Sequence, residues 1–444
     1  MTFLDHIKSR TDLYVLLVSW ALVGFVAPTI VAVGYSALTF LLVLRTRDIT
    51  KIFIAFIAML VFSDSRSSMF AFAETAKIGA VVLLFLYVVL NWGKFSQNSN
   101  KVFVYFLPFL LYAVAASAWA NDPFNAFQKS FSYGLIFFLV PVVFAQGLKD
   151  NRNIPVELVY FFSVLLAVGL IIHLVNPSFT SLVGRYRGLL GNPNGLGIFL
   201  TVVFAVYYPV RKEYELLSSN QRFTWFFLIV FIASLVLTGS RTSLIALALF
   251  FGFNRLRYLS NAITVIVFIV LVLSYEYLLL QLPIIIQSLG LAEYFRLDTL
   301  EEGSGRFIAW NFAWQRIQEV FFVGGGFTHT EYVFRLFSDE LSRLGHQGNA
   351  HNSYLTLWLD TGLIGIVLFG LGLVRTVAAA IKSSPYTLPI VYAVLFSTYF
   401  ESWLSASLNP FTSLFLIALT LLAIPADALD KNKIRQNESN PVEE

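Results

Sequence analysis

The chain has 444 residues, of which 57% are hydrophobic and only 13% are charged. A soluble domain carries about 25% charged residues, so this composition excludes an ordinary soluble protein and indicates a polytopic membrane protein. There is no cysteine, which excludes disulfides, thiolate nucleophiles and cysteine-bound metals. The formal net charge of +4 says little by itself, so the positions of the charges carry more information.

Apolar runs separated by short polar segments recur along the chain. Backbone groups in lipid must be hydrogen-bonded within their own segment, so continuous apolar runs predict helices rather than a barrel. We therefore predict an all-α polytopic membrane protein with about 12–14 transmembrane helices. The candidate spans lie near residues 12–27, 29–44, 52–63, 78–92, 102–118, 130–146, 156–175, 196–210, 223–238, 242–254, 262–280, 354–374, 386–402 and 409–424. The third and tenth of these are short for a span.

The positions of lysine and arginine predict the orientation. If the N-terminus is cytoplasmic and the spans alternate, most of the 30 basic residues fall on the cytoplasmic side, as the positive-inside rule requires. Both termini are then cytoplasmic. Residues 1–425 form a single transmembrane helical bundle that includes one large outer loop at 281–352, and the polar segment 426–444 is a disordered cytoplasmic tail.

Within the outer loop, residues 304–321 have apolar side chains at helical spacing. This pattern predicts an amphipathic helix that lies on the bundle or on the outer leaflet. The expected apolar face consists of Phe307, Trp310, Trp314, Ile317 and Phe321. Tryptophans in this half of the protein can belong to an interfacial belt or can stack on sugar rings, and the sequence leaves both roles open.

Arg185 and Arg187 lie in "SLVGRYRGLLGNPNGLGIF", residues 181–199, at the outer end of a span. Asn192 or Asn194 can cap the helix that follows, whose positive N-terminal end would point outward. Two arginines beside a helix N-terminus form an anion site that suits phosphate. The alternative is that both arginines reach toward lipid headgroups.

Two further arginines are expected at the outer face. Arg241, in "LTGSRTSLIALAL", stands between two apolar runs, where a charge must face the bundle interior, water or a partner. It is either a functional residue or part of a structural ion pair with Glu401 or Asp360. Arg306 is expected within the flexible turn "EEGSGR", residues 301–306.

His351 opens the apolar segment "AHNSYLTLWLDTGLIG" and is one of only five histidines. A histidine is largely neutral near pH 7, so His351 can act as a general base, or it can simply be a solvated residue at a helix start. Asn352 is expected to cap the following helix and so to aim the imidazole. Glu401, in "YFESWLSASLNP", can support the site by pairing with an arginine. Asp360 has no clear role.

The loop histidines show no HxH or HExxH spacing, so we expect no metal site and no cofactor.

Two other classes of protein, a transporter and a structural scaffold, are alternatives to an enzyme that uses these residues. A secondary transporter would place charges near the bilayer midplane, on broken helices in repeated halves, whereas these charges gather at one face. A purely structural scaffold would leave the outer arginines and His351 unexplained.

Taken in order, these segments resemble the O-antigen ligase and Wzy-type O-antigen polymerase superfamily of bacterial membrane glycosyltransferases. The resemblance rests on Arg185 and Arg187 with "GNPNGLG", on "GSRTS", on "SGR…W" with "VGGGF", and on "AHNSYLTLWLDTGLIG", with "FESWLSASLNP" as a weaker match. It covers about residues 180–370. The N-terminal 150 residues match only in being helical.

The resemblance implies a GT-C-like bundle in the bacterial inner membrane, with the large loop and the active site at the periplasmic face. Members transfer a glycan from undecaprenyl pyrophosphate to an acceptor hydroxyl without a metal ion, and in-line attack would invert the anomeric carbon. The family arginines that hold the donor pyrophosphate correspond to Arg185, Arg187, Arg241 and Arg306, and the family histidine corresponds to His351.

The resemblance does not decide which acceptor is used, because the superfamily includes two activities with different acceptors. A polymerase extends a second lipid-linked chain, whereas a ligase transfers the finished glycan to lipid A core. The segments "GNPNGLG" and "GSRTS" are slightly more similar to the polymerase side, so we expect an O-antigen or surface-polysaccharide polymerase, with ligase as the alternative. The expected partners are the lipid-linked donor, the glycan or lipid A core acceptor, the bilayer and a chain-length regulator, but no nucleic acid.

Overall fold

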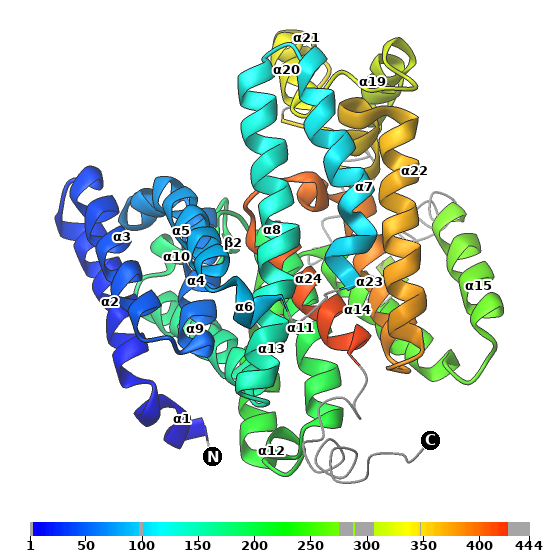
Figure 1. Ribbon diagram of the computed structural model, residues 1–444. Coiled ribbons are helices and arrows are strands. Elements are labelled where there is room, and N and C mark those ends of the chain that lie inside the picture. The colour runs from blue at the N-terminus through cyan, green and yellow to red at the C-terminus, as the bar shows by residue number, and fades with distance from the viewer. Residues whose placement is uncertain (1–2, 97–100, 275–286, 289–305, 347, 425–444) are drawn as a thin grey trace, which may run out of the picture.

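The computed structural model shows a bundle of helices (Figure 1) and describes residues 3–96, 101–274, 287–288, 306–346 and 348–424. The prediction of an all-α polytopic membrane protein is confirmed. The helices are α1 (Phe3–Ser9), α2 (Thr11–Val26), α3 (Thr29–Arg45), α4 (Ile49–Asp64), η1 (Ser68–Phe70), α5 (Ala71–Leu90), α6 (Trp92–Phe95), α7 (Lys101–Ala115), η2 (Ala116–Trp119), α8 (Pro123–Asp150), α9 (Ile154–Val175), α10 (Pro177–Thr180), α11 (Pro193–Glu213), α12 (Glu215–Ser218), α13 (Gln221–Thr238), α14 (Arg241–Leu256), α15 (Asn261–Leu273), α19 (Arg306–Glu319), α20 (His329–Leu336), α21 (Ser338–Arg343), α22 (Ser353–Ile381), α23 (Thr387–Phe400), η4 (Ser402–Ser405) and α24 (Pro410–Ala423). The strands β1 (Ser181–Leu182) and β2 (Arg185–Tyr186) form one short antiparallel hairpin.

Three expectations fall wholly or partly outside the described residues. The tail expected at 426–444 lies wholly outside them, and the span expected at 262–280 is described to residue 274. Of the loop expected at 281–352, residues 287–288, 306–346 and 348–352 are described.

Short polar side chains begin many of the long helices. The side chains of Asp122, Asn192, Asn352 and Asn409 accept hydrogen bonds from backbone N–H groups in the first turns of α8, α11, α22 and α24. These N–H groups have no partner within their own helix, so each cap satisfies a donor that would otherwise be buried. Proline at the first helical position of α8, α11 and α24 adds to this effect, because its fixed φ suits a helix start.

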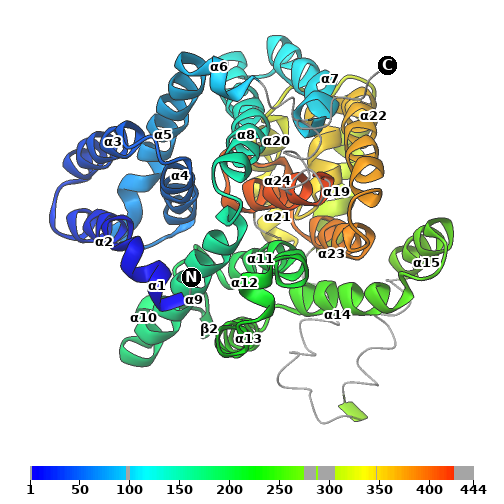
Figure 2. The same cartoon turned by 60° about the horizontal axis from the view of Figure 1, so that its bottom comes forward.

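The centre of the bundle is formed by α4, α11 and α24, which are buried along almost their whole lengths. Helix α24 packs against α11, α8 and α22, and α4 packs against α5, α8 and α24. Figure 2 shows α24 enclosed by neighbouring helices, whereas α15 stands at the edge of the molecule beyond α14. The helices that lead to the outer end are therefore held by a rigid centre.

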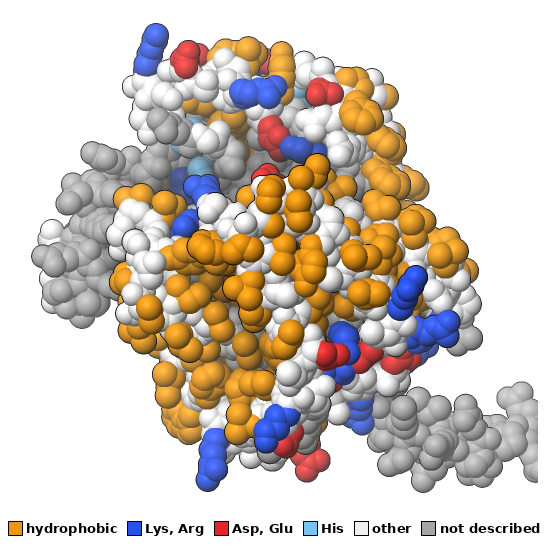
Figure 3. All heavy atoms as spheres, turned by 90° about the vertical axis from the view of Figure 1, so that its left-hand side faces the viewer, with side chains coloured by type: hydrophobic (Ala, Val, Ile, Leu, Met, Phe, Trp, Pro, Cys, Tyr) orange, Lys and Arg blue, Asp and Glu red, His pale blue; other side chains and the backbone are white. Residues whose placement is uncertain are grey.

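The apolar helices agree with a membrane protein. Seven described helices are long and apolar enough to cross a bilayer, or up to eight if the bent pair α1–α2 is one span, and four shorter apolar helices accompany them. The two spans expected to be short correspond to α4 and α14. Figure 3 shows hydrophobic side chains covering the middle of one face, with charged side chains toward its two ends.

Helices α19, α20 and α21 form a layer at one end of the bundle, opposite α1 and α12 (Figure 1). Helix α19 occupies much of the segment expected to be helical, but its buried face is different. Ala309, Phe312, Ala313 and Ile317 are buried, whereas Trp314 is 46% exposed. The expected face was therefore wrong in part, because small side chains, and not the largest ones, allow α19 to lie close against α22.

Helix α22 is broken at Gly362, where φ is 64° and ψ is −173°. The backbone there pairs with the loop that follows α19: Leu363 donates to the carbonyl of Phe321 (2.9 Å), and Gly326 donates to the carbonyl of Asp360 (3.0 Å). A side chain at Gly362 would meet the backbone of this loop at 2.3 Å. The glycines therefore allow two backbones to bond side by side, which fixes the outer layer to α22.

Candidate functional site

Glu401 lies at the C-terminal end of α23 and is the centre of a polar network. Its Oε2 lies 3.3 Å from Nδ1 of His351, and its Oε1 lies 3.1 Å from Nη2 of Arg306. Oε1 also accepts a hydrogen bond from the side-chain amide of Asn194 (3.2 Å). One carboxylate thus joins three segments that lie between 50 and 207 residues away along the chain.

His351 occupies a constrained position just before α22. Its φ of 45° is unusual for a residue with a side chain, and its backbone N–H donates to Oδ1 of Asn349 at 2.8 Å. The side chain is 34% exposed. No described residue makes a hydrogen bond to Nε2, and Cα of Gly348 lies on that side of the ring, since a Cβ there would be 3.6 Å from Nε2. The ring therefore has one bound nitrogen and one accessible nitrogen.

The start of α22 and the segment around Glu401 are locked together. Asn352 caps α22 with its side chain, while its backbone N–H donates to Oγ of Ser402 at 2.9 Å. The hydroxyl of Ser353 donates to the backbone carbonyl of Glu401 at 2.7 Å. Asn352 therefore has the capping role expected from the sequence, and these bonds also set the position of His351 relative to Glu401.

Arg306 and Arg185 approach Glu401 from different elements. Arg306 is the first residue of α19 rather than part of a turn, and its guanidinium lies over the ring of Phe400 at 5.7 Å. Arg185, in β2, donates to Oδ1 of Asn194 at 3.0 Å and to the carbonyl of Thr238 at 2.8 Å. Asn194 thus connects Arg185 to Glu401.

Arg241 is the first residue of α14, close to Arg185. Gly239 ends α13 in the left-handed conformation, and a Cβ on it would lie 3.6 Å from Nε of Arg185. At Gly197 of α11 a Cβ would meet the hydroxyl of Ser243 at 2.4 Å, so α14 begins in close contact with α11. The segment that carries Arg241 is therefore held at the same end of the bundle as Arg185.

Arg187 lies apart from this network. Its guanidinium donates to the carbonyls of Phe179 (3.2 Å) and Gly191 (3.4 Å). Burial, and to a smaller extent the nearby Arg66, lower the pKa of Arg187. The structure therefore brings Arg185, Arg306, His351, Asn352 and Glu401 together and places Arg187 in the packing of the β1–β2 hairpin.

Residues 226–370 match the family model described as O-antigen ligase. This domain supports a place for the protein in the O-antigen ligase and Wzy superfamily. It supports, in general terms, a glycosyltransferase activity of the O-antigen ligase or polymerase type on lipid-linked glycans in a membrane. A search of curated proteins finds no match to the chain.

The O-antigen ligase domain contains only part of the network. Arg306, His351 and Asn352 lie within the matched residues, as does Arg241 nearby in the sequence of α14, whereas Arg185, Asn194 and Glu401 lie outside them. The network is therefore completed by α11, the β1–β2 hairpin and the end of α23, which the fold brings to the edge of the family domain.

Sequence reasoning missed the bridging role of Asn194. The sequence left Asn192 and Asn194 as alternative caps of α11, and the structure shows that Asn192 accepts from Gly195 N–H at 2.8 Å. Asn194 is then left to bridge Arg185 and Glu401. The only available signal was that two asparagines stand where a helix needs one cap.

Asp360 also has a position that the sequence did not predict. Its Oδ1 accepts hydrogen bonds from both the backbone N–H and the hydroxyl of Thr330, each at 2.8 Å. Asp360 is buried, and it therefore fastens the start of α20 to α22 instead of pairing with Arg241.

The electrostatics of the site are uneven. Figure 3 shows basic and histidine side chains in a hollow between the outer layer and the apolar middle of the protein. Arg306 contacts Glu401 directly, and Arg185 is linked to it through Asn194. Arginine guanidinium groups in such a setting bind phosphate groups with paired hydrogen bonds.

Proposed function

We propose that this chain transfers a glycan from an undecaprenyl-pyrophosphate-linked donor to an acceptor hydroxyl at the periplasmic face of the bacterial inner membrane. The observation that supports this proposal most directly is the position of Glu401, which contacts a histidine through one carboxylate oxygen and an arginine through the other. A base and an anion-binding group are thus held at a fixed separation by one side chain.

In this proposal His351 is the general base. An ionised carboxylate can only accept hydrogen bonds, so the contact with Glu401 places the imidazole proton on Nδ1 and leaves the lone pair of Nε2 available. As the acceptor oxygen attacks the anomeric carbon, its proton moves to Nε2. Glu401 then stabilises the imidazolium that forms, as the carboxylate does in a catalytic triad.

The arginines bind the leaving group. The bond between the anomeric carbon and the phosphate oxygen breaks as the new glycosidic bond forms, and negative charge develops on the lipid pyrophosphate. Arg306 and Arg185 can neutralise this charge with preorganised N–H donors. We place Arg241 beside them as a third pyrophosphate ligand. Attack from the side opposite the leaving group inverts the anomeric configuration, and the proposed step uses no metal ion or cofactor.

The acceptor that we propose is a second lipid-linked glycan, which makes the chain an O-antigen or surface-polysaccharide polymerase. This choice rests on the "GNPNGLG" and "GSRTS" segments. Identification of the product separates the two activities: a longer lipid-linked glycan indicates a polymerase, and a glycan on lipid A core indicates a ligase.

A broken helix such as α22 would also suit the alternative of a secondary transporter, whose broken helices line a substrate site. At this break, however, the backbone groups next to Gly362 are hydrogen-bonded to the loop after α19. The break therefore supports attachment of the outer layer better than it supports a transport site.

The proposal is tested with purified protein in liposomes that contain the undecaprenyl-pyrophosphate glycan. His351→Ala and Arg241→Ala should each abolish glycan transfer while the protein stays folded. His173→Ala is a matched control, because His173 contacts Thr180 and not Glu401. Wild-type transfer by both His351→Ala and Arg241→Ala would overturn the proposed site, and strong inhibition by EDTA would overturn the metal-independent step.

The proposed orientation has its own test. The sequence has no cysteine, so a single cysteine placed at the exposed Arg343 provides a unique label. A membrane-impermeant maleimide added to spheroplasts should label it without lysis. Labelling only after lysis would place α21 in the cytoplasm and contradict a periplasmic active site.

A further inference from the structure

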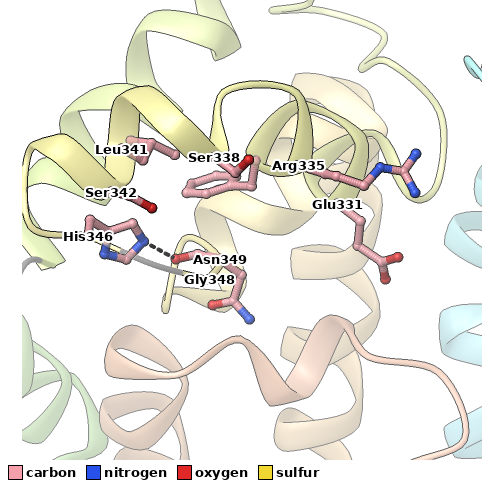
Figure 4. A pocket seen from close by; sticks show the side chains of 9 residues that line it. Glu331, Arg335, Ser338, Leu341, Ser342, His346, Gly348 and Asn349 are labelled. Carbon is pink, nitrogen blue, oxygen red and sulfur yellow. Dashed lines mark hydrogen bonds between the residues drawn. The ribbon is translucent and has the colours of Figure 1, made fainter.

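A cavity of about 410 Å³ lies in the outer layer, next to the network around Glu401 (Figure 4). Its size is within the range of small-molecule pockets, about 300–1,000 Å³. Its walls come from α20, α21 and the loop that precedes His351. The lining residues are Glu331, Phe334, Arg335, Ser338, Leu341, Ser342, His346, Gly348 and Asn349.

One wall of this cavity is shared with His351. Asn349 lines the cavity and accepts the backbone N–H of His351, and Gly348 lies against Nε2 of the imidazole. The rings of His346 and His351 are perpendicular, with centroids 5.9 Å apart. Gly348, which has no side chain, thus lines the cavity and also lies next to Nε2 of His351.

His346 is held in the wall by Asn349. Its Nε2 lies 3.1 Å from the carbonyl of Asn349, the contact drawn in Figure 4, and its side chain is buried. Since a carbonyl only accepts, this contact places a proton on Nε2. Burial, with a smaller effect of His351, lowers the pKa of His346. His346 is therefore neutral near pH 7 and donates to the backbone of the loop that precedes His351.

The side chains that line the cavity differ in chemistry from the arginines near Glu401, Arg306 and Arg185. Glu331 and Arg335, one helical turn apart on α20, offer one charge of each sign, and Glu331 is also paired with Lys129 of α8 at 2.6 Å. Ser338, Ser342 and Asn349 add neutral hydrogen-bonding groups beside the apolar Phe334 and Leu341. Such a lining suits a ligand with many hydroxyl groups and apolar ring faces, and it does not select a polyanion such as pyrophosphate.

We infer that this cavity binds the terminal sugar of the acceptor and presents its hydroxyl to Nε2 of His351. The inference rests on the proposed function and adds to it the place of the second substrate. The donor pyrophosphate lies on the Arg306 side of Glu401, and the acceptor sugar lies on the His351 side. Glu331, Arg335 and Ser342 determine which sugar is accepted.

The test fills the cavity without touching the network around Glu401. Ser342→Trp, and Ser338→Trp as a second independent variant, place an indole in the cavity from exposed positions on α21. Leu344→Trp is the matched control, because Leu344 is 57% exposed and does not line the cavity. Thermal unfolding in detergent should be the same for all three variants.

Two soluble probes identify the acceptor by direct binding to the whole protein. One is the oligosaccharide released from the lipid-linked repeat unit of the host, and the other is the oligosaccharide released from its lipid A core. Saturation-transfer NMR should show binding of one probe to the wild type and to Leu344→Trp, with a Kd at least about tenfold weaker in the two cavity variants, a change of about 1.4 kcal/mol. His351→Ala should still bind the probe, with a smaller loss of affinity than in the two cavity variants, because only one contact to the hydroxyl is removed.

The outcomes separate this inference from the proposed function. If the cavity variants bind both probes as the wild type does, or if the wild type binds neither, the cavity is not the acceptor site, whatever His351→Ala does to transfer. If the cavity variants lose binding while His351→Ala retains transfer, the acceptor site stands and the proposed base is wrong. In steady-state kinetics, the cavity variants should raise KM for the acceptor and leave KM for the donor unchanged.

Discussion

Two carboxylates in this protein, Glu401 and Glu157, have the same kinds of partner at opposite ends of the bundle. Glu401 contacts Arg306, His351 and the amide of Asn194. At the other end, Glu157 contacts an arginine (Arg10, 2.9 Å), a histidine (His6, 3.7 Å) and an asparagine (Asn151, 2.7 Å). The residue types alone therefore do not distinguish a functional site from a structural one.

Exposure distinguishes the two networks. His6 is fully buried and Glu157 is 6% exposed, whereas His351 is 34% exposed beside a cavity. Arg10 is shared between Glu157 and a second carboxylate, Asp48. Arg306 contacts Glu401, and Arg185 is linked to Glu401 through Asn194. A fully buried network supports the fold, whereas a partly exposed network with arginines beside a cavity can contact a ligand.

The largest effect should come from removing each carboxylate in turn. Glu401→Ala should lower the rate of transfer by a factor on the order of 10⁴, because His351 loses the group that fixes its tautomer, while thermal unfolding changes little. Glu157→Ala should cost about 3–5 kcal/mol of stability, because Arg10 and His6 lose a buried partner, while the folded fraction remains active. Transfer assays and thermal unfolding of both variants check this. Similar losses of stability in the two variants would contradict the distinction.

Arg306 should be the next most sensitive position. Arg306→Ala should lower kcat/KM for the donor by about 10²-fold, because one preorganised donor to the leaving phosphate is lost. Arg306→Lys should restore part of this rate, since a point charge replaces a planar fork. Arg316→Ala, on the same helix, is the control, because Arg316 pairs with Glu319 and not with Glu401. An equal loss in Arg316→Ala would mean that α19, and not the guanidinium of Arg306, sets the rate.

The sequence predicted the parts of the site that depend on local patterns. Apolar runs located the helices, and the distribution of lysine and arginine among the loops placed Arg185, Arg306 and His351 at the same face. The partnership of Asn194 with Glu401 could not be predicted, because 207 residues separate the two side chains. Arg187 was grouped with Arg185 because the two are close in sequence before a helix start and because the resemblance assigned both to the donor pyrophosphate. The strand β2 ends at Tyr186, and the chain turns at Gly188 with φ 58°, so the two arginines have different surroundings.

The two asparagines at the start of α11, Asn192 and Asn194, allow the same comparison between a structural and a functional residue, with smaller expected effects. Asn194→Ala should lower transfer by about tenfold and leave stability nearly unchanged, because it removes the link between Arg185 and Glu401, about one hydrogen bond to a charged group. Asn192→Ala should cost about 1 kcal/mol of stability, because a helix cap is lost, with normal activity per folded molecule. The transfer rate and the free energy of unfolding, measured for both variants, test these two roles. A loss of stability in Asn194→Ala and a loss of transfer in Asn192→Ala would make Asn194 the structural residue.

The smallest effect concerns the outer layer and pH. Burial lowers the pKa of His329 and of His346, which lie at the start of α20 and in the loop after α21. Both are neutral in the folded layer, so an unfolded layer binds more protons once the pH falls below about 6.5, the ordinary pKa of histidine. The layer is therefore most firmly docked above that pH and loses stability as the pH falls toward the lowered pKa values.

Hydrogen exchange measures this loss directly. After correction for intrinsic rates, amides of α20 and α21 should exchange faster at pH 5 than at pH 7, whereas those of the buried helix α4 should not. His346→Asn should reduce the difference, because an uncharged amide has no proton to gain. Equal protection of α20 at both pH values would show that these imidazoles do not control the layer. The cavity wall next to His351 would then have to be rigid for other reasons, chiefly the backbone pairing at Gly362 and the bonds from Asp360 to Thr330.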